Sequence, residues 1–455
     1  MAFREISERP ALPPTGALSK SLAHFARPSG ANILARTESF LRWQDGRRSA
    51  EVWPYSRALV GPPTNRATVQ TEQGETIEGI NFASQDYLAL STHPAIKAAA
   101  IQALEEFGPH SASSPMLQGS STLSLLLENA LSDLLQTEHV VLFSTGWGAG
   151  FGAITALIRP ADHIILDNLA HACLQQGAHT ATQNVRRHDH LDIAAVRRHL
   201  QEIRANDTKN GILVVTEGLF SMDSDTPDLQ TLQELCHEYE AALLVDVAHD
   251  LGAIGPGGTG FLGIQKMLGK VDLVVGAFSK TFASNGGFLA THSRAVKHYV
   301  KIFGGTHIFS NGLSPVQAAV VREAINIVRS PEGEDLRCHL HQSVHGLRDA
   351  FAEYGIRCLG VPSAVVPVPI GSEKVARIAS ANLLHKGVFA NLVEFPAVAV
   401  GSARFRMQVM ASHTPAQVQC AADRVVEAIQ EAKDMLADAD MTHAVVNTEN
   451  EMASV

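Results

Sequence analysis

Short, uninterrupted runs of apolar residues recur through the middle of the chain, separated by stretches long enough to hold a helix. Runs of this kind, without polar alternation, are typical of strands buried on both faces of a parallel sheet. The clearest runs cover residues 140–143, 163–166, 212–215, 243–247 and 273–278. Strands that alternate with helices in this way predict an α/β fold with a mostly parallel sheet and right-handed crossovers.

Beyond residue 315 the pattern changes to helices around short strands. Helices are predicted near 315–330 and over 332–354, and strands over 364–370 and 404–410. The apolar stripe of the longer helix consists of Leu336, Leu340, Val344, Leu347 and Phe351. Residues at this spacing share one helix face, so we expect the stripe to pack against a core.

These patterns predict four segments along the chain. They are an N-terminal arm (1–65), a large domain (66–315), a small C-terminal α+β domain (316–436) and a disordered tail (437–455). Two short strands within 66–84 are expected to join the smaller domain. The tail is polar and lacks periodicity, which is the basis for predicting disorder there.

Polar residues follow the predicted strands at the points where the strands end. They are Gly146 and Trp147, His171, Glu217 and Ser221, Asp246 and His249, and Lys280. In open α/β sheets, ligands bind outside the carboxyl ends of the strands. We therefore expect these side chains to meet at one edge of the sheet.

The residue types fit catalysis by pyridoxal phosphate. A lysine that is partly desolvated at a strand end has a lowered pKa, which lets Lys280 form a Schiff base with the cofactor aldehyde. Asp246 would keep the pyridine nitrogen protonated, so that the ring acts as an electron sink. Backbone N–H groups of Gly146 and Trp147, at a helix start, would bind the phosphate.

Three further residues are candidates around the cofactor ring. His171 would stack on its face, while His249 and Ser221 would bond its oxygen. Taken singly, Asp246 could cap a helix, His171 could be a core histidine and Ser221 a turn residue. Their ordered spacing along the chain favours a common site.

Composition excludes several other classes of function. The chain has 455 residues, 45% hydrophobic and 18% charged, with a net charge of −10. Such a chain is long enough for two domains, and the negative charge without a basic stripe argues against nucleic-acid binding. No apolar run reaches the roughly 18 residues needed to span a bilayer. Five scattered cysteines, without a secretory leader pattern at the start, fit a cytoplasmic protein.

Histidine is plentiful, so a metal site is one hypothesis. Cys338, His341 and His345 share a face of the predicted helix 332–354, opposite its apolar stripe. A solvated polar face explains this arrangement, and no metal is expected. His188 and His190 are expected in a surface turn.

Four segments resemble signature motifs of the α-oxoamine synthases. They are Asp167-Asn168-Leu169-Ala170-His171-Ala172, Thr216-Glu217-Gly218-Leu219-Phe220-Ser221-Met222-Asp223, Asp246-Val247-Ala248-His249, and Ala403-Arg404-Phe405-Arg406 with Ser412-His413-Thr414. The resemblance covers roughly residues 65 to 432. It implies a fold-type I pyridoxal phosphate enzyme, with a seven-stranded type of mostly parallel sheet in the large domain and a smaller α+β domain.

The resemblance also implies an activity. Members of this family condense a small amino acid (serine, alanine or glycine) with an acyl thioester of coenzyme A or carrier protein. The product is usually decarboxylated to an α-aminoketone. The sequence around Lys280 and the long arm favour a serine palmitoyltransferase-like member. An aminotransferase, or an aldolase for β-hydroxy amino acids, is the alternative enzyme on this fold, and a scaffold protein without catalysis is the non-enzymatic one.

Further site residues follow from the resemblance. Arg406 would clamp the substrate carboxylate, Gln85 would contact substrate, and Glu217 and Ser221 would serve the site. Lys280 would act as both covalent anchor and base.

The chain departs from the family pattern at Ala277, where a threonine usually binds the phosphate. Ser279, or Ser310 and Asn311 from a second copy, would replace that contact. The resemblance therefore implies a homodimer with active sites at the interface.

Overall fold

The apolar runs of the central chain form a seven-stranded sheet in the computed structural model, which describes residues 12–452. The strands in spatial order are β4 (His139–Phe143), β10 (Gly287–Thr291), β9 (Leu273–Ala277), β8 (Ala242–Asp246), β7 (Ile212–Glu217), β5 (His163–Asp167) and β6 (Val185–His188). Only β10 runs antiparallel to its neighbours in this sheet. The mostly parallel α/β architecture predicted from the sequence is thus confirmed.

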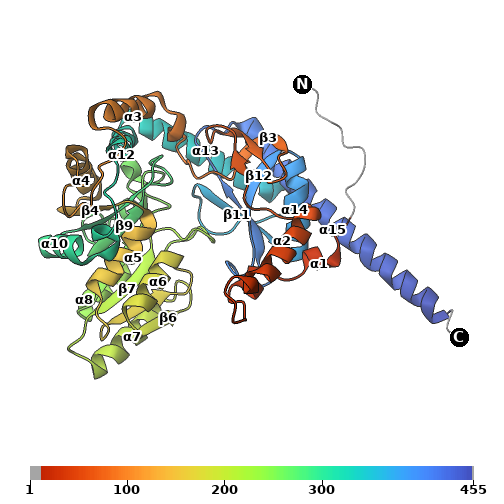
Figure 1. The fold of residues 1–455 in the computed structure, drawn as a ribbon, viewed down its shortest axis with the longest axis horizontal. Helices are drawn as coiled ribbons and strands as arrows, with labels where there is room; N and C mark the ends of the chain where they lie inside the picture. Colours follow the sequence, from red (N-terminus) through yellow and green to blue (C-terminus); the bar gives the residue numbers. More distant parts are fainter. Residues whose placement is uncertain (1–11, 453–455) are drawn as a thin grey trace.

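Helices cover both faces of this sheet, which explains why its strands lack polar alternation (Figure 1). Val141 and Phe143 point into a core shared with α5 (Gly146–Leu157) and α6 (Ala172–Ala181). Val140 and Leu142 point into the core on the other face. The helices of that second core are α3 (Pro94–Phe107), α4 (Thr122–Leu135), α7 (Ile193–Asn206), α8 (Leu229–Glu238) and α12 (Pro315–Val328).

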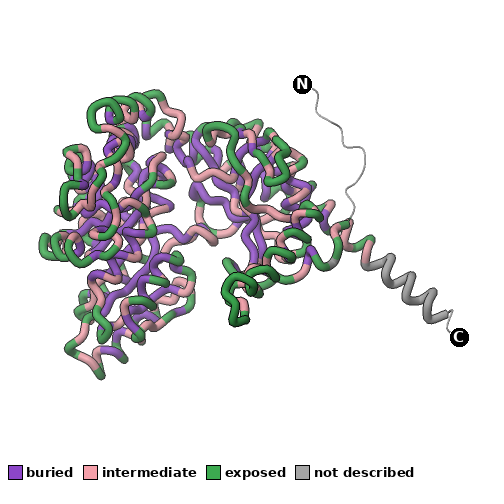
Figure 2. Tube along the Cα trace, in the orientation of Figure 1, coloured by how far each residue is buried: buried purple, intermediate pink, exposed green. Residues whose placement is uncertain are grey.

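The remaining helices of this part of the chain are short or lie at its edge. They are α9 (Gly260–Ile264), α10 (Arg294–Phe303) and α11 (Gly305–Ile308). Figure 2 shows buried residues concentrated in the interior of both parts of the chain and exposed residues on the outer helices, and strand β1 at the edge of the second sheet is exposed.

A second sheet combines strands from both ends of the chain. Its order is β1 (Ala58–Leu59), β2 (Arg66–Gln70), β3 (Thr76–Phe82), β12 (Val388–Val393), β13 (Ala403–Gln408) and β11 (Val365–Gly371). The parallel pairing of β3 with β12 joins the two ends. The helices that follow or flank it are α13 (Pro331–Glu353), α14 (Glu373–His385) and α15 (Pro415–Met452).

The end of α15 differs from the sequence prediction. Disorder was expected for 437–455, whereas α15 continues to Met452. Residues 437–452 contain neither glycine nor proline, so no helix breaker interrupts a helix that has already begun. Residues 453–455, and residues 1–11 of the predicted arm, lie outside the described part of the chain.

The described part of the N-terminal arm packs on the second sheet through a buried charge cluster. The arm contains α1 (Thr15–Leu18) and α2 (Glu38–Ser49). Arg47, on α2, lies 3.5 Å from Glu394, which also accepts a 2.6 Å hydrogen bond from Arg377. Arg377 donates in addition to the carbonyl of Lys20 at 2.7 Å. All three charged side chains are at most 3% exposed, so the arm is part of the core there.

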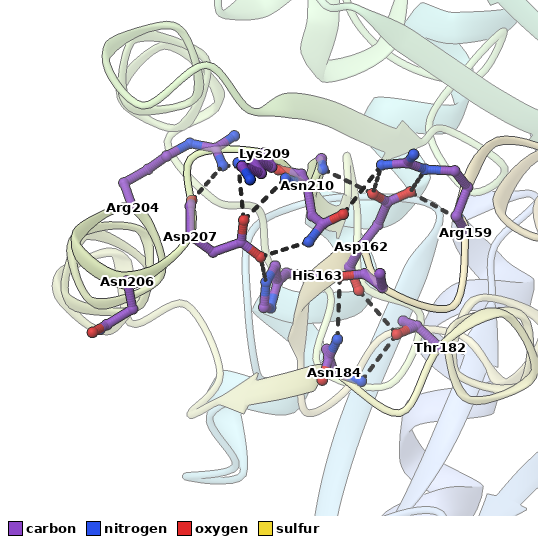
Figure 3. A network of polar contacts seen from close by, with 12 residues as sticks. Arg159, Asp162, His163, Thr182, Asn184, Arg204, Asn206, Asp207, Lys209 and Asn210 are labelled. Carbon is purple, nitrogen blue, oxygen red and sulfur yellow. Dashed lines mark hydrogen bonds and ion pairs between the residues drawn. The ribbon is translucent and has the colours of Figure 1, made fainter.

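A polar network fastens the amino ends of β5 and β7 (Figure 3). Asp162 accepts hydrogen bonds from the N–H groups of Arg159 and Gly211, each at 2.8 Å. His163 lies 3.0 Å from Asp207, which begins the turn into β7. These contacts lie at the end of the sheet opposite the predicted site, and they hold its strands in register.

Candidate active site

The predicted polar residues meet at the carboxyl edge of the seven-stranded sheet. Parallel pairing sets Glu217, the last residue of β7, beside Asp246, the last residue of β8. Lys280 follows β9 by three residues, and His171 follows β5 by four. Together they surround a cavity of about 260 Å³. Its lining comprises Thr145, Gly146, Trp147, His171, Cys173, Glu217, Asp246, Ala248, His249, Gly276, Ala277, Ser279, Lys280, Asn285 and Gly286.

Lys280 lies in a tight loop that leaves β9 and returns into β10. Its carbonyl accepts the N–H of Ala283 at 3.2 Å, and the N–H of Phe278 bonds the carbonyl of Gly286 at 3.0 Å. Burial lowers the pKa of the Lys280 amine, while the charges of Asp246 and Glu217 oppose that shift. The amine is therefore easier to deprotonate than a surface lysine.

The two carboxylates beside Lys280 have different partners. Asp246 accepts the N–H of Ala248 at 2.9 Å, and burial raises its pKa against the opposing charges of Lys280 and His171. Glu217 accepts the main-chain N–H of His171 at 2.6 Å. Burial, followed by the charge of Asp246, raises the pKa of Glu217 well above its usual value. Glu217 thus anchors the loop that carries His171.

Two histidines border the cavity as neutral rings. Burial lowers the pKa of His171, and the Trp147 ring lies edge-on to it with centroids 6.1 Å apart. Burial also lowers the pKa of His249 well below its usual value, and the positive charges of Lys280 and Arg406 add to this effect. Nδ1 of His249 lies 2.9 Å from the hydroxyl of the fully buried Tyr87.

The start of α5 forms another wall of the cavity. The Thr145 side chain caps the N–H of Gly148 at 2.9 Å, which leaves the N–H groups of Gly146 and Trp147 without helical partners. A Cβ atom on Gly146 would lie 2.3 Å from Cβ of Ala277, so these two positions must both stay small. Helix N-terminal N–H groups favour an anion such as a phosphate.

This set of groups fits pyridoxal phosphate. A buried amine faces two carboxylates, an aromatic ring and an imidazole line the walls, and free helix N–H groups lie at one end. The amine matches the aldehyde of the cofactor, and the carboxylates match its ring nitrogen. The aromatic ring and the imidazole match its flat ring, and the helix N–H groups match its phosphate. Ala277 supplies no hydroxyl there, which leaves the phosphate to main-chain donors and to Ser279.

Arg406 is a buried cation that forms no ion pair among the described residues. On the same face of β13, Arg404 is paired with Asp223. Arg406 Nη1 instead lies 3.8 Å from Sδ of Met222, and its Nε has no hydrogen-bond partner. Its charge lowers the pKa values of Lys280 and His171, so it lies within electrostatic reach of both. A guanidinium without an acidic partner here suits a substrate carboxylate.

A larger cavity of about 430 Å³ meets the first one at Lys280. Ser279, Lys280 and Asn285 line both cavities. The rest of the larger lining is Pro63, Ser84, Gln85, Asp86, Ser91, Ala283, Ser284, Val316, Gln317 and Val320. Lys280 therefore lies between a small enclosed chamber and a larger polar one that contains Gln85.

Four predicted site residues lie outside both cavity linings, and one of them is Arg406 on β13. Ser221 lies in the turn after β7. Ser310 and Asn311 lie in the segment after α11, where Ser144 donates to the Asn311 carbonyl. Their roles stay predictions.

Three residues that sequence reasoning missed lie at the site. Tyr87 bonds His249, Cys173 lies 3.0 Å from Nδ1 of His171, and Asn285 lines both cavities. Each is within six residues of a predicted one, but no sequence pattern tells which neighbour turns inward.

The prediction of a surface turn is wrong for His188, which ends β6 and is buried. His190 does lie in a turn, but its side chain is only 20% exposed. Its ring nitrogens lie 2.9 Å from Asp167 and 3.1 Å from Asp225. Burial opposes a positive charge on the ring, but the two carboxylates outweigh it and raise the pKa of His190 to about 10. His190 thus links the end of β5 to the loop after β7.

Among the residues whose side chains the structure describes, no cluster of three or more histidine, cysteine or acidic side chains has the arrangement to hold a metal ion. No helix in the described part of the chain is both long and apolar enough to cross a membrane.

The chain is similar in sequence to proteins of known families. The family model for aminotransferase class I and II matches residues 77–425. An 8-amino-7-oxononanoate synthase of Trichlorobacter lovleyi is 34% identical over 357 residues, which cover 78% of this chain and 90% of the relative. A serine palmitoyltransferase of Sphingobacterium spiritivorum is 33% identical over 352 residues, covering 77% and 87%.

Solved structures give the same comparison in three dimensions. The serine palmitoyltransferase of Sphingomonas wittichii superposes with a TM-score of 0.82 at 26% identity, covering 89% of this chain and 99% of that one. An SPT structure with PLP as an internal aldimine also superposes with a TM-score of 0.82 and 26% identity, covering 88% and 99%.

Proposed function

Because the chain belongs to the α-oxoamine synthases of the aminotransferase class I and II family, we propose that it joins a small amino acid to an acyl thioester at the Lys280 site. It is a pyridoxal phosphate enzyme of the acyltransferase type. The observation that carries the proposal is Arg406, a cation without an acidic partner among the described residues, whose charge acts on Lys280 and His171 in the cavity wall. That combination provides for a cofactor and for an amino-acid carboxylate together.

The cofactor would be held by the groups that line the smaller cavity. Lys280 would bond its aldehyde carbon, Asp246 its ring nitrogen, and the N–H groups of Gly146 and Trp147 its phosphate. Pyridoxal phosphate, when bound, supplies an electron sink for the pair left behind when the α-proton of the amino acid is removed. His171 and His249 would border the ring as neutral imidazoles.

Lys280 would move the proton in this reaction. Because burial lowers the pKa of its amine, Nζ loses its proton more readily than a surface lysine and is suited to act as a base. The carboxylate of Asp246 would be kept ionised by the protonated ring nitrogen of the cofactor, against the burial that raises its pKa. Glu217 would keep His171 in place through its main-chain bond.

Arg406 and the larger cavity would bring in the two substrates. Arg406 would bind the amino-acid carboxylate through a fork of two hydrogen bonds. The larger cavity reaches Lys280 and is lined by Gln85, Asn285 and Gln317, whose amides can bond the polar arm of a thioester. The released thiol would leave by the same route, and the product would be an α-aminoketone after decarboxylation.

A homodimer is part of the proposal. Phe309 is 87% exposed and Leu117 is 74% exposed, although both are large and apolar. Their segments adjoin, because Ser114 donates to the Ile308 carbonyl at 2.6 Å. A second copy covering this patch would bury it and carry Ser310 and Asn311 towards a neighbouring site.

Domain division and location are proposed on separate grounds. The strand order of the two sheets supports a large domain that ends near residue 315 and a small domain whose sheet includes β2 and β3. All five cysteines are free thiols, which supports a reducing compartment such as the cytoplasm.

The test is the visible absorption of the cofactor-loaded chain, titrated separately with glycine, L-alanine and L-serine. We expect a yellow protein whose band shifts saturably with one of the three. A chain that stays colourless after pyridoxal phosphate is added would overturn the proposal. Amino transfer to an added 2-oxo acid, without any thioester, would instead identify an aminotransferase.

A further inference from the structure

The thiol of Cys173 contacts the ring of His171 directly. His171 caps α6, and its Nδ1 accepts the main-chain N–H of Cys173 at 3.3 Å. Sγ of Cys173 lies 3.0 Å from the same nitrogen. A main-chain N–H can only donate, so Nδ1 must be the acceptor in this arrangement. The proton of the neutral ring therefore lies on Nε2.

The state of the thiol is set by its surroundings. Cys173 is 2% exposed, and burial together with the charges of Asp246 and Glu217 raises the pKa of the thiol well above its usual value. The thiol keeps its proton at neutral pH and acts as a donor. Two donors thus converge on Nδ1 of His171.

The sulfur of Cys173 packs against helix α5 at a glycine. A Cβ atom on Gly150 would lie 2.8 Å from Sγ of Cys173, which is closer than such atoms approach. Glycine at this position therefore lets the thiol lie against both helices.

We propose that Cys173 is a positioning residue, whose thiol holds His171 in the tautomer that offers Nε2–H to the acceptor group of a substrate. The inference rests on the proposed function, because His171 lines the cofactor cavity. Four charged or titratable groups act on His171 besides the thiol. Asp246 favours its protonation, Lys280 and Arg406 oppose it, and Glu217 holds its main chain.

The first test measures the ring tautomer in the chain without cofactor. Histidine-ring ¹⁵N–¹H spectra, with His171 assigned by loss of its signals in His171→Gln, should report Nε2–H in the wild type and in Cys173→Ser. In Cys173→Ala the main-chain N–H still donates to Nδ1, so the ring should stay mainly Nε2–H but with a measurable share of the Nδ1–H tautomer. A wild-type ring protonated on Nδ1, or an unchanged tautomer in Cys173→Ala, would overturn the proposal.

The second test is the pH profile of the loaded enzyme. The two hydrogen bonds donated to Nδ1 stabilise the neutral ring of His171. Loss of one of them raises the pKa of His171, so the fall in kcat at acidic pH begins at a higher pH. We expect Cys173→Ala to lose about fivefold in kcat at pH 6, the size of one hydrogen bond, and little at pH 8.5. Cys173→Ser should restore the profile. The matched control, Cys236→Ala, removes another buried cysteine on α8 and should leave the profile unchanged.

The outcomes separate this inference from the proposed function. A chain that condenses no amino acid with any thioester would contradict the function, while the ring-nitrogen spectra of the unloaded chain would remain readable. An active chain in which Cys173→Ser behaves like Cys173→Ala would contradict the positioning role alone.

Discussion

At the residue scale, the site was largely predictable because its residue types are chemically particular. Lys280, Asp246 and His171 were predicted from their positions after apolar runs, and the structure brings all three to one cavity. Cys173 and Tyr87 were not predicted, because only the turn of the backbone decides that they face the histidines. Residue chemistry is readable from sequence, whereas the choice between adjacent residues requires coordinates.

The role of Arg406 gives a residue-scale prediction. Arg406→Ala should raise the amino-acid KM by about tenfold to a hundredfold, because a charge-assisted pair contributes about 1.5–3 kcal/mol. Cofactor content should stay unchanged, since no cofactor contact is assigned to this side chain. Steady-state kinetics and absorbance measure the two effects. Arg404→Ala is the contrast: it breaks the pair with Asp223 and should lower stability more than affinity. An unaltered KM in Arg406→Ala would remove Arg406 from the substrate site.

At the element scale, most apolar strands were predictable, whereas strands of mixed character, and the short buried strand β10, were not. Five of the seven large-sheet strands were predicted as apolar runs. The missed strand β6 reads Val185-Arg186-Arg187-His188, since it lies at the edge of the sheet and only partly in the core. The missed strand β12 contains Asn391, whose side chain bonds the Ala83 carbonyl at 2.9 Å. Such partners are invisible to a periodicity argument.

The Asp162 network gives a prediction about strand ends. Asp162→Ala should lower the free energy of unfolding by about 2 kcal/mol, because the N–H groups of Arg159 and Gly211 lose their acceptor. Urea unfolding measures this change. The exposed Asp349→Ala on α13 is the control and should fall within about 0.5 kcal/mol of wild type. Equal stability of the two variants would show that the network of Figure 3 contributes nothing measurable.

His190 gives a prediction about pH. Its folded pKa of about 10 exceeds the roughly 6.5 of an unfolded histidine. The contribution of His190 to the free energy of unfolding is therefore fully present below pH about 6.5 and is lost as pH rises towards 10. The difference in unfolding free energy between wild type and His190→Gln should be larger at pH 6 than at pH 10. A difference that grows with pH would contradict the charged-histidine assignment.

At the scale of the whole molecule, the sequence order conceals which parts share a sheet. The pairing of β3 with β12 joins residues more than three hundred positions apart. The cluster of Arg47, Arg377 and Glu394 likewise joins the N-terminal arm to the C-terminal third of the chain. Short strands in 66–84 were expected beside the smaller domain, but the buried charge cluster had no sequence signal, since each member is an ordinary charged residue in a helix or loop.

The proposed dimer gives a prediction at this scale. Phe309→Asp should convert a dimer into a monomer, because a carboxylate would be buried against the partner. Light scattering measures the molecular mass in solution. Activity should fall together with the mass if Ser310 and Asn311 serve the site of the neighbouring copy. An exposed residue far from the patch, Tyr354→Asp, should leave the mass unchanged. A wild-type chain that is monomeric at micromolar concentration would contradict the interface.

The most direct test of the central claim is release of free thiol from acyl thioesters of coenzyme A and of carrier protein, measured with glycine, L-alanine and L-serine. The account predicts thiol release only when one of these amino acids and a thioester are both present, and none in Lys280→Ala. Thiol release that is independent of the amino acid, or retained in Lys280→Ala, would contradict condensation at this site.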